Sequence, residues 1–152
     1  MALKIDQAQI PGLARRFAAL LYDLIVLFGI LLLATSLVII PASTLSEAEV
    51  RLDGWLLILF RIYLVAVGYG FVGYFWVHGG QTLGMRTWRM RLVQDNGQPL
   101  SRGATWRRLF WATLIPAPVG LLLIPFDPQG LAPHARLSQT LPIELPLKTK
   151  TI

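Results

Sequence analysis

Asp23 is the residue whose type and position most directly suggest chemistry. It is the only charged residue in an apolar run from Phe17 to Ile40. An ionisable side chain at the centre of a membrane-spanning helix costs about 2.5–3.5 kcal/mol on insertion scales, and such residues commonly serve ion or proton pathways. Three interpretations follow. Asp23 bonds the backbone or an arginine of a neighbouring segment, it takes up a proton or a cation, or it lies without a partner at the membrane interface.

Arg16 is the basic residue closest to Asp23 on the same predicted helix face. The two are seven positions apart, which corresponds to about 10.5 Å along a helix axis. Because helical side chains lean toward the N-terminus, Arg16 points away from Asp23. We therefore expect each residue to find its partner on another segment. Asp23 and Arg16 are the candidate transport or ion-binding residues.

The remaining polar residues do not form a recognisable catalytic or metal-binding pattern. The chain has no cysteine and two histidines, His78 and His134, neither of which has an acidic residue at ligand spacing. The glycine-rich stretch that begins at His78 lacks the spacing of a nucleotide-binding loop. No nucleophile and base lie at a workable spacing. The sequence predicts no catalytic residue, no metal site and no cofactor, and a protein that is not an enzyme.

The distribution of apolar residues predicts an all-α integral membrane protein. The chain has 152 residues, of which 55% are hydrophobic and 14% charged, and the apolar residues gather into long runs. Two transmembrane helices are expected, followed by a third hydrophobic segment that Pro116 and Pro118 break. That segment either spans the membrane or forms a re-entrant hairpin. The three segments cover about residues 17–40, 55–77 and 109–126, and the first is expected to stop at Pro41.

The basic residues indicate the orientation of the chain. Lysine and arginine number three before the first span, one in the 41–54 loop and six in the 78–108 segment. The positive-inside rule therefore places the N-terminus and segment 78–108 in the cytoplasm, as expected of a multi-pass protein of the bacterial cytoplasmic (inner) membrane. The partners expected are the lipid bilayer and anionic headgroups at this basic segment, and not nucleic acid. The tryptophans are read as interfacial anchors: Trp55, Trp76, Trp88, Trp106 and Trp111.

Two stretches outside the apolar runs have the pattern of strands. Trp88 to Val93 alternates and precedes a turn, and Gln139 to Leu145 is a second extended candidate. If they form a short cytoplasmic β-pair, both ends of the third segment lie on the cytoplasmic side, which favours the re-entrant form. Three prolines and two lysines predict a mostly extended, frayed tail over residues 127–152: Pro133, Pro142, Pro146, Lys148 and Lys150.

Three short motifs occur in an order that resembles the RDD family. They begin at Arg16, Gly80 and Arg91 with the letters RFAALLYD, GQTLGMR and RLVQDNG, and HARLSQT follows from His134. The resemblance implies one domain over residues 1–152, with the family's arginine and aspartate at Arg16 and Asp23. Ala135 stands where the family's second aspartate is expected. The other motif positions are Gly80, Gln81, Thr82, Gly84, Arg86, His134, Arg136 and Thr140.

The family resemblance implies transport of an unidentified ligand, with cation/proton exchange through an intramembrane aspartate proposed for some members. A mechanism that needs two carboxylates is weakened by Ala135. Three hydrophobic segments enclose a path only thinly, so a homo-oligomer or a partner membrane protein is expected. The alternative is a non-transporting accessory or scaffold protein that binds anionic lipid or a protein partner, in which Asp23 only holds helices together.

Overall fold

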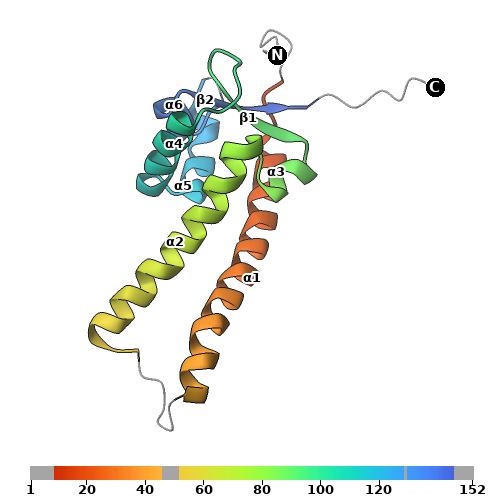
Figure 1. Cartoon of the computed structure of the whole chain (residues 1–152). Coiled ribbons are helices and arrows are strands. Elements are labelled where there is room, and N and C mark those ends of the chain that lie inside the picture. Colours follow the sequence, from red (N-terminus) through yellow and green to blue (C-terminus); the bar gives the residue numbers. More distant parts are fainter. Residues whose placement is uncertain (1–8, 46–51, 129, 146–152) are drawn as a thin grey trace, which may run out of the picture. The chain divides into compact units, whose positions relative to one another are not determined.

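The computed structural model describes residues 9–45, 52–128 and 130–145. It is mostly helical, with two long apolar helices, a bent third segment and a two-stranded antiparallel sheet (Figure 1). These features confirm the predicted fold class. The helices are α1 (Leu13–Leu45), α2 (Gly54–Gly79), α3 (Leu83–Thr87), α4 (Arg102–Leu114), α5 (Ala117–Leu122) and α6 (Pro133–Leu137), with a 3-10 turn η2 (Ile124–Phe126) and the strands β1 (Met90–Gln94) and β2 (Thr140–Glu144).

Two helices, α1 and α2, are long and apolar enough to cross a membrane. The candidate spans are Leu13–Thr44 and Gly54–Gly79, which contain the predicted spans 17–40 and 55–77. At about 1.5 Å per residue, either helix exceeds a hydrocarbon core of about 30 Å. The protein is therefore a membrane protein with two candidate spans, or three if the bent segment counts as one.

The prediction that the first helix stops at Pro41 is wrong, because α1 continues through Pro41 to Leu45. Proline lacks the N–H that would bond the carbonyl four residues earlier. Proline is tolerated in membrane helices, and one missing hydrogen bond does not end α1. In the last turn, Ser43 Oγ donates to the Ile40 carbonyl at 2.8 Å, and Thr44 Oγ1 donates to the Pro41 carbonyl at 2.9 Å. The connection to α2 is therefore shorter than predicted, and residues 46–51 within it lie outside the described residues.

The described residues divide into two compact units, 9–23 with 73–145 and 24–72. In the second unit, the later part of α1 and the first part of α2 run antiparallel (Figure 1). Tyr63 donates its hydroxyl to the Ala34 carbonyl at 3.3 Å, and Leu27 lies over Gly68. The first unit holds every candidate site residue named above.

The two strands pair antiparallel, which confirms the predicted β-pair. The register runs from Met90 opposite Glu144 to Gln94 opposite Thr140. The N–H of Leu92 points away from β2, because it donates to the Gly80 carbonyl at 2.7 Å. Pro142, opposite Leu92, therefore occupies a position where the ladder needs no N–H. On the inner face, Leu92 packs with Leu100 and Ala104 in a small core.

Part of the predicted frayed tail is instead ordered secondary structure. Pro133 is the first residue of α6, where its fixed φ and missing N–H suit a helix start. Pro142 lies within β2, as described above. The tail prediction is therefore wrong for residues 133–137, whereas the extended stretch predicted over 139–145 is confirmed by β2. Its remainder, over residues 146–152, lies outside the described residues.

The third hydrophobic segment is bent, as the prolines predict. α4 begins at residue 102, earlier than the predicted 109, because Ser101 caps it by accepting a hydrogen bond from the Ala104 N–H at 3.2 Å. The helices Arg102–Leu114 and Pro118–Phe126 are inclined to each other by 84°. The chain leaves the sheet at Gln94 and returns opposite it at Thr140. Residues 95–139, which include the bent segment, therefore begin and end at the same end of the sheet.

Candidate functional site

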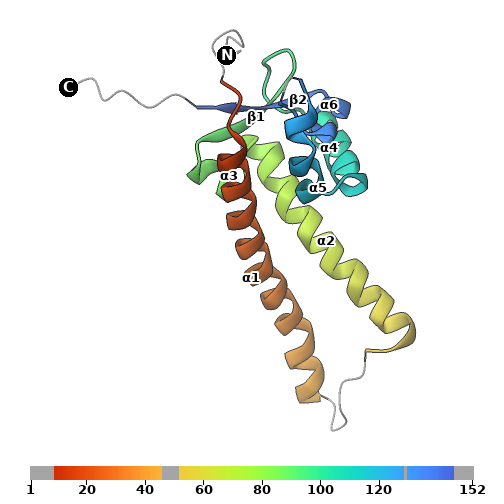
Figure 2. The same ribbon diagram turned by 180° about the vertical axis from the view of Figure 1, so that it is seen from behind.

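The Asp23 carboxylate bonds the start of α3. Its Oδ2 accepts a hydrogen bond from the Thr82 hydroxyl, and its Oδ1 accepts one from the Gly84 N–H at 2.7 Å. Thr82 is itself the N-cap of α3, because its Oγ1 accepts a hydrogen bond from the Met85 N–H. Of the three interpretations of Asp23, the geometry matches the one in which the carboxylate bonds the backbone of a neighbouring segment. Figures 1 and 2 both show α3 beside the first turns of α1.

The motif glycines permit two close approaches of the backbone. A Cβ on Gly84 would lie 2.2 Å from the Ala19 carbonyl oxygen and 2.9 Å from Asp23 Cγ. Gly80 has a φ of 64°, and a Cβ there would lie 2.7 Å from the Leu92 carbonyl oxygen. Gln81 between them donates its side-chain amide to the Met90 carbonyl at 2.8 Å. This motif therefore builds the connection between α2, α3 and β1.

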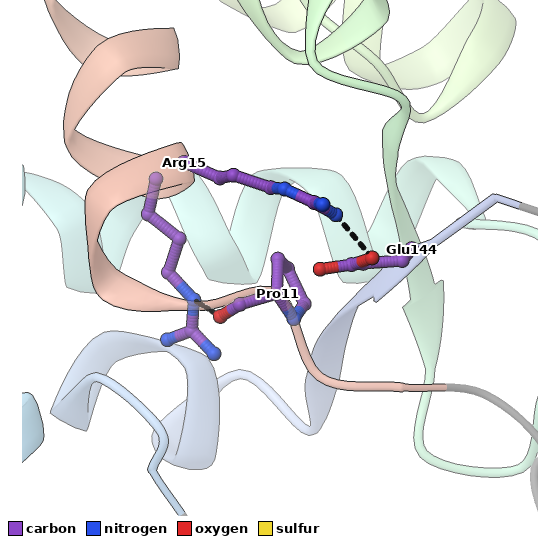
Figure 3. Close-up of polar contacts among 4 residues, drawn as sticks. Pro11, Arg15 and Glu144 are labelled. Carbon is purple, nitrogen blue, oxygen red and sulfur yellow. Dashed lines mark hydrogen bonds and ion pairs between the residues drawn. The ribbon is translucent and has the colours of Figure 1, made fainter.

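Arg16 is buried and donates its Nε–H to the Pro11 carbonyl at 2.8 Å. Its neighbour Arg15 instead forms an ion pair with Glu144 on β2, as Figure 3 shows. The Glu144 N–H also donates to the Gln9 carbonyl at 2.9 Å, so the chain entering α1 lies against the sheet. No carboxylate in residues 9–45, 52–128 and 130–145 forms an ion pair with Arg16.

Arg108 is a second buried arginine, from α4, with 6% of its surface exposed. Its Nη1 donates to Thr140 Oγ1, and its guanidinium carbon lies 5.2 Å from the centre of the Trp76 ring. Thr140 Oγ1 also lies 2.7 Å from Ser138 Oγ, which bonds the His134 carbonyl at 2.6 Å. The hydrogen bonds therefore join α4, α6 and β2 around the Arg108 guanidinium.

A cavity of about 150 Å³ lies among these residues, and Arg16, Asp23, Trp76, Arg108 and His134 line it together with apolar side chains. Three buried nitrogens find no hydrogen-bond partner among the described residues: Trp76 Nε1, Arg108 Nε and His134 Nδ1. A buried polar group without a partner costs about 1–3 kcal/mol, so native proteins contain few of them. Three in one cavity is a concentration that suggests a ligand.

His134 is neutral at pH 7 in this environment. Burial, together with the charges of Arg108 and Arg16, lowers the pKa of His134 from 6.5 to about 3. The charged residues that line the cavity are then two arginines and Asp23. Gly120 on α5 closes over the imidazole, since a Cβ there would lie 2.7 Å from His134 Nδ1. The His134 ring is therefore held tightly as well as kept uncharged.

The sequence identified some of this site and missed the rest. Asp23, Arg16 and His134 line the cavity with Thr82, while Thr140 supports it through Arg108. Arg86 is exposed, and Arg136 pairs with Asp127 at 3.2 Å, so these two motif arginines do not line it.

Arg108 and Trp76 were predicted to have other roles, and Ser138 was not singled out. Arg108 counted only as one of six cytoplasmic charges, and Trp76 only as an interfacial anchor. The position of Arg108 directly before a run of apolar residues is the signal that would have marked it. Ala135 is 2% exposed and also lines the cavity.

The order of the motifs agrees with a comparison against protein families. The family model described as "RDD family" matches residues 10–139. The chain belongs to the RDD family. The match includes every RDD motif residue named above except Thr140, which lies just beyond it. No curated protein and no solved structure matches the chain.

Proposed function

We propose that this RDD-family chain is a transport-related membrane protein that binds a small ligand in the cavity between α1, α4 and α6. The observation that supports the proposal is the set of three unpaired buried nitrogens beside Arg16, Arg108 and Asp23. A ligand that accepted hydrogen bonds there would remove the cost of leaving these groups unpaired. Cavities with a few convergent polar groups in an apolar wall are typical ligand sites.

Of the two transport functions implied by the family, ligand transport has more support here than cation/proton exchange. Both oxygens of Asp23 already accept hydrogen bonds, from Thr82 and Gly84. Two guanidinium groups line the same cavity, and like charges repel an incoming cation. Ala135 leaves the position of the second family carboxylate apolar. Asp23 in this proposal positions α3 at the edge of the ligand site.

The proposal includes a membrane placement and partners. The N-terminus and residues 78–108 lie in the cytoplasm of a bacterial cell, at the inner membrane, and the bent α4 and α5 form a re-entrant hairpin. The strand pairing supports the hairpin, because residues 95–139 begin and end at the same end of the sheet. Exposed Arg86 and Arg89 contact anionic headgroups. A second copy or a partner membrane protein completes the path, and the chain catalyses no reaction.

Reconstitution into proteoliposomes tests transport directly. A pH-sensitive dye inside the vesicles reports proton flux driven by Na⁺, K⁺ or Li⁺ gradients, and labelled pyruvate and glycine report solute uptake. We expect the native chain to take up a solute and Arg108→Gln to lose that uptake. The matched control is Arg102→Gln, which removes an exposed charge from the same helix. Proton flux that depends on a cation and disappears in Asp23→Asn would instead support the exchange function. No flux of any kind from the native chain contradicts transport.

The second candidate is the accessory or scaffold function, and one observation favours it. Asp23 uses both oxygens to hold α3, which is what a purely structural aspartate does. In that case Asp23→Ala would weaken folding, while no solute or ion would cross the vesicle membrane. Co-purification of one defined membrane protein with the native chain, lost when residues 78–108 are altered, would add direct support.

A further inference from the structure

The residues that line the cavity carry a net positive charge. Arg16 and Arg108 supply two positive charges, Asp23 supplies one negative charge, and His134 is neutral. Within the described part of the chain, neither arginine forms an ion pair with a carboxylate. Burying a charge without a counter-ion is costly. One further negative charge in the cavity would balance it.

The unpaired nitrogens indicate which kind of negative group fits. Arg108 Nε and Trp76 Nε1 are donors only, so each needs an acceptor. The Arg108 side chain is more than nine-tenths buried and lines the cavity. His134 Nδ1 lies against Gly120 of α5, so the donors offered to a ligand are those of Arg108 and Trp76. A group with several acceptor oxygens satisfies these donors, and guanidinium groups match carboxylate geometry especially well.

The remaining wall of the cavity is apolar and suits the hydrocarbon part of a ligand. It includes Leu20, Met85, Leu92 and Ile124 together with four alanines. A volume of about 150 Å³ accommodates a carboxylate attached to a few carbon atoms. A multiply charged anion would exceed the single positive charge that is uncompensated.

We propose that the cavity binds a small organic monoanion, a carboxylate with a short apolar body, through the free N–H groups of Arg108 and Trp76. This inference rests on the proposed function for its biological meaning, because it names the class of ligand for the same cavity. Its physical basis is independent of transport. Arg16 contributes charge, and the apolar wall receives the hydrocarbon part of the anion.

The indole N–H of Trp76 provides a local measure of binding. Isotope-labelled protein in phosphate-free detergent is titrated with sodium propionate, with propionamide and with propylammonium chloride, at constant ionic strength set with sodium chloride. The three probes share a similar size and differ in charge. We expect a saturable shift of the Trp76 indole resonance, assigned with Trp76→Phe, for propionate alone. An equal response to propionamide or propylammonium, or no response to any probe, would overturn the proposal.

Variants at Ala135 test the charge argument without removing an arginine. Ala135 is buried and lines the cavity, so Ala135→Asp places a fixed carboxylate where the anion would bind. Ala135→Asn adds a side chain of nearly the same shape without the charge. We expect the dissociation constant for propionate to be at least ten times higher in Ala135→Asp than in Ala135→Asn. Equal weakening would mean that only space matters, and it would overturn the charge argument.

A second experiment removes the Arg108 donor, and a third tests whether a lipid occupies the cavity. Arg108→Gln should abolish the propionate response, while Arg102→Gln should leave it unchanged. If Arg108→Gln fails to fold, the Ala135 pair still decides the question.

A Trp76 shift on addition of phosphatidylglycerol, with none for propionate, would assign the site to a lipid phosphate and overturn the proposal. Propionate binding without flux in vesicles contradicts only the transport proposal, and solute flux without propionate binding contradicts only this one.

Discussion

At the scale of single residues, the contact between Gly84 and α1 is the tightest feature of the site. The nearest atom to a Cβ on Gly84 is a backbone oxygen, of Ala19, at 2.2 Å. Backbone cannot move aside as a flexible side chain can, so α3 would have to shift away from Asp23. We expect Gly84→Ala to lower the free energy of unfolding by about 1–3 kcal/mol, the usual cost of overpacking. Chemical unfolding in detergent measures the loss.

Gly103 is the matched control for that substitution. It also lies in a helix, and a Cβ there would meet nothing within 4 Å. Gly103→Ala should be neutral or stabilise the protein by about 0.5–1 kcal/mol, because alanine favours the helix more than glycine does. Equal losses from the two substitutions would show that the Ala19 contact is not responsible.

His134 makes stability depend on pH in a defined direction. Its pKa is about 3 in the folded protein against 6.5 for the unperturbed side chain, so the unfolded state binds a proton first as pH falls. The stabilisation from neutral His134 is complete above pH 6.5 and is lost progressively toward pH 3, by up to about 1.4 kcal/mol per pH unit. The groups that face the ring are Arg108 from α4, Arg16 from α1 and Gly120 from α5.

Melting temperatures between pH 8 and pH 5 test this dependence above the range in which most carboxylates titrate. The native chain should lose stability below pH 6.5, and His134→Gln should show a flatter profile over the same interval. Parallel profiles would mean that His134 is not held neutral in the folded protein.

At the scale of elements, Thr140 connects the third hydrophobic segment to the sheet. It is 1% exposed and accepts a hydrogen bond from Arg108, so it joins β2 to α4. Thr140→Val replaces only the hydroxyl by a methyl group and leaves the Arg108 donor unpaired. We expect the unfolding free energy to fall by about 1–3 kcal/mol. Thr87→Val is the comparison, because Thr87 is exposed and its hydroxyl bonds only its own helix, at Leu83. A comparable loss there would contradict the role of Thr140.

The sequence predicted most elements, because local patterns specify them. Apolar runs located α1 and α2, and alternation with a turn located β1 and β2. Pro41 misled the prediction, since a membrane helix can accommodate proline and α1 continues past it to Leu45. The tail was misread at Pro133, because this proline occupies the first position of a helix, where its ring fits.

At the scale of the whole molecule, the predicted orientation of the chain in the membrane is easy to test because of its composition. The chain has no cysteine, so single cysteines can be introduced without other changes. Ser43→Cys, near the end of α1, should react with an impermeant maleimide from outside the cell. Asn96→Cys and Leu137→Cys, on either side of the bent segment, should react only from the cytoplasmic side of inverted vesicles. The reverse pattern would contradict the positive-inside assignment, and opposite sides for the last two would contradict the hairpin.

The candidate site itself was only partly predictable, because distant parts of the chain build it. Asp23 and Arg16 attracted attention through an unusual charge in an apolar run, which is a local signal. Arg108 and Trp76 meet only after α2, α4 and the sheet have packed, and no spacing in the sequence records that meeting. An arginine in this basic segment also fits the positive-inside rule, and a tryptophan near a span end also fits an interfacial anchor, so residue type alone did not assign them to the site. The cavity and its unpaired nitrogens became visible only in three dimensions.

The hydrogen bonds of Asp23 also set an order for biogenesis. Its partner Gly84 is 61 positions later in the chain, so a ribosome adding about 5–20 residues per second leaves the carboxylate unsatisfied for seconds after α1 is made. Arg108 waits in the same way for Thr140, 32 positions further on. A nascent chain that has not yet made β2 therefore lacks the acceptor of Arg108, and α4 can be joined to the sheet only after β2 has been made.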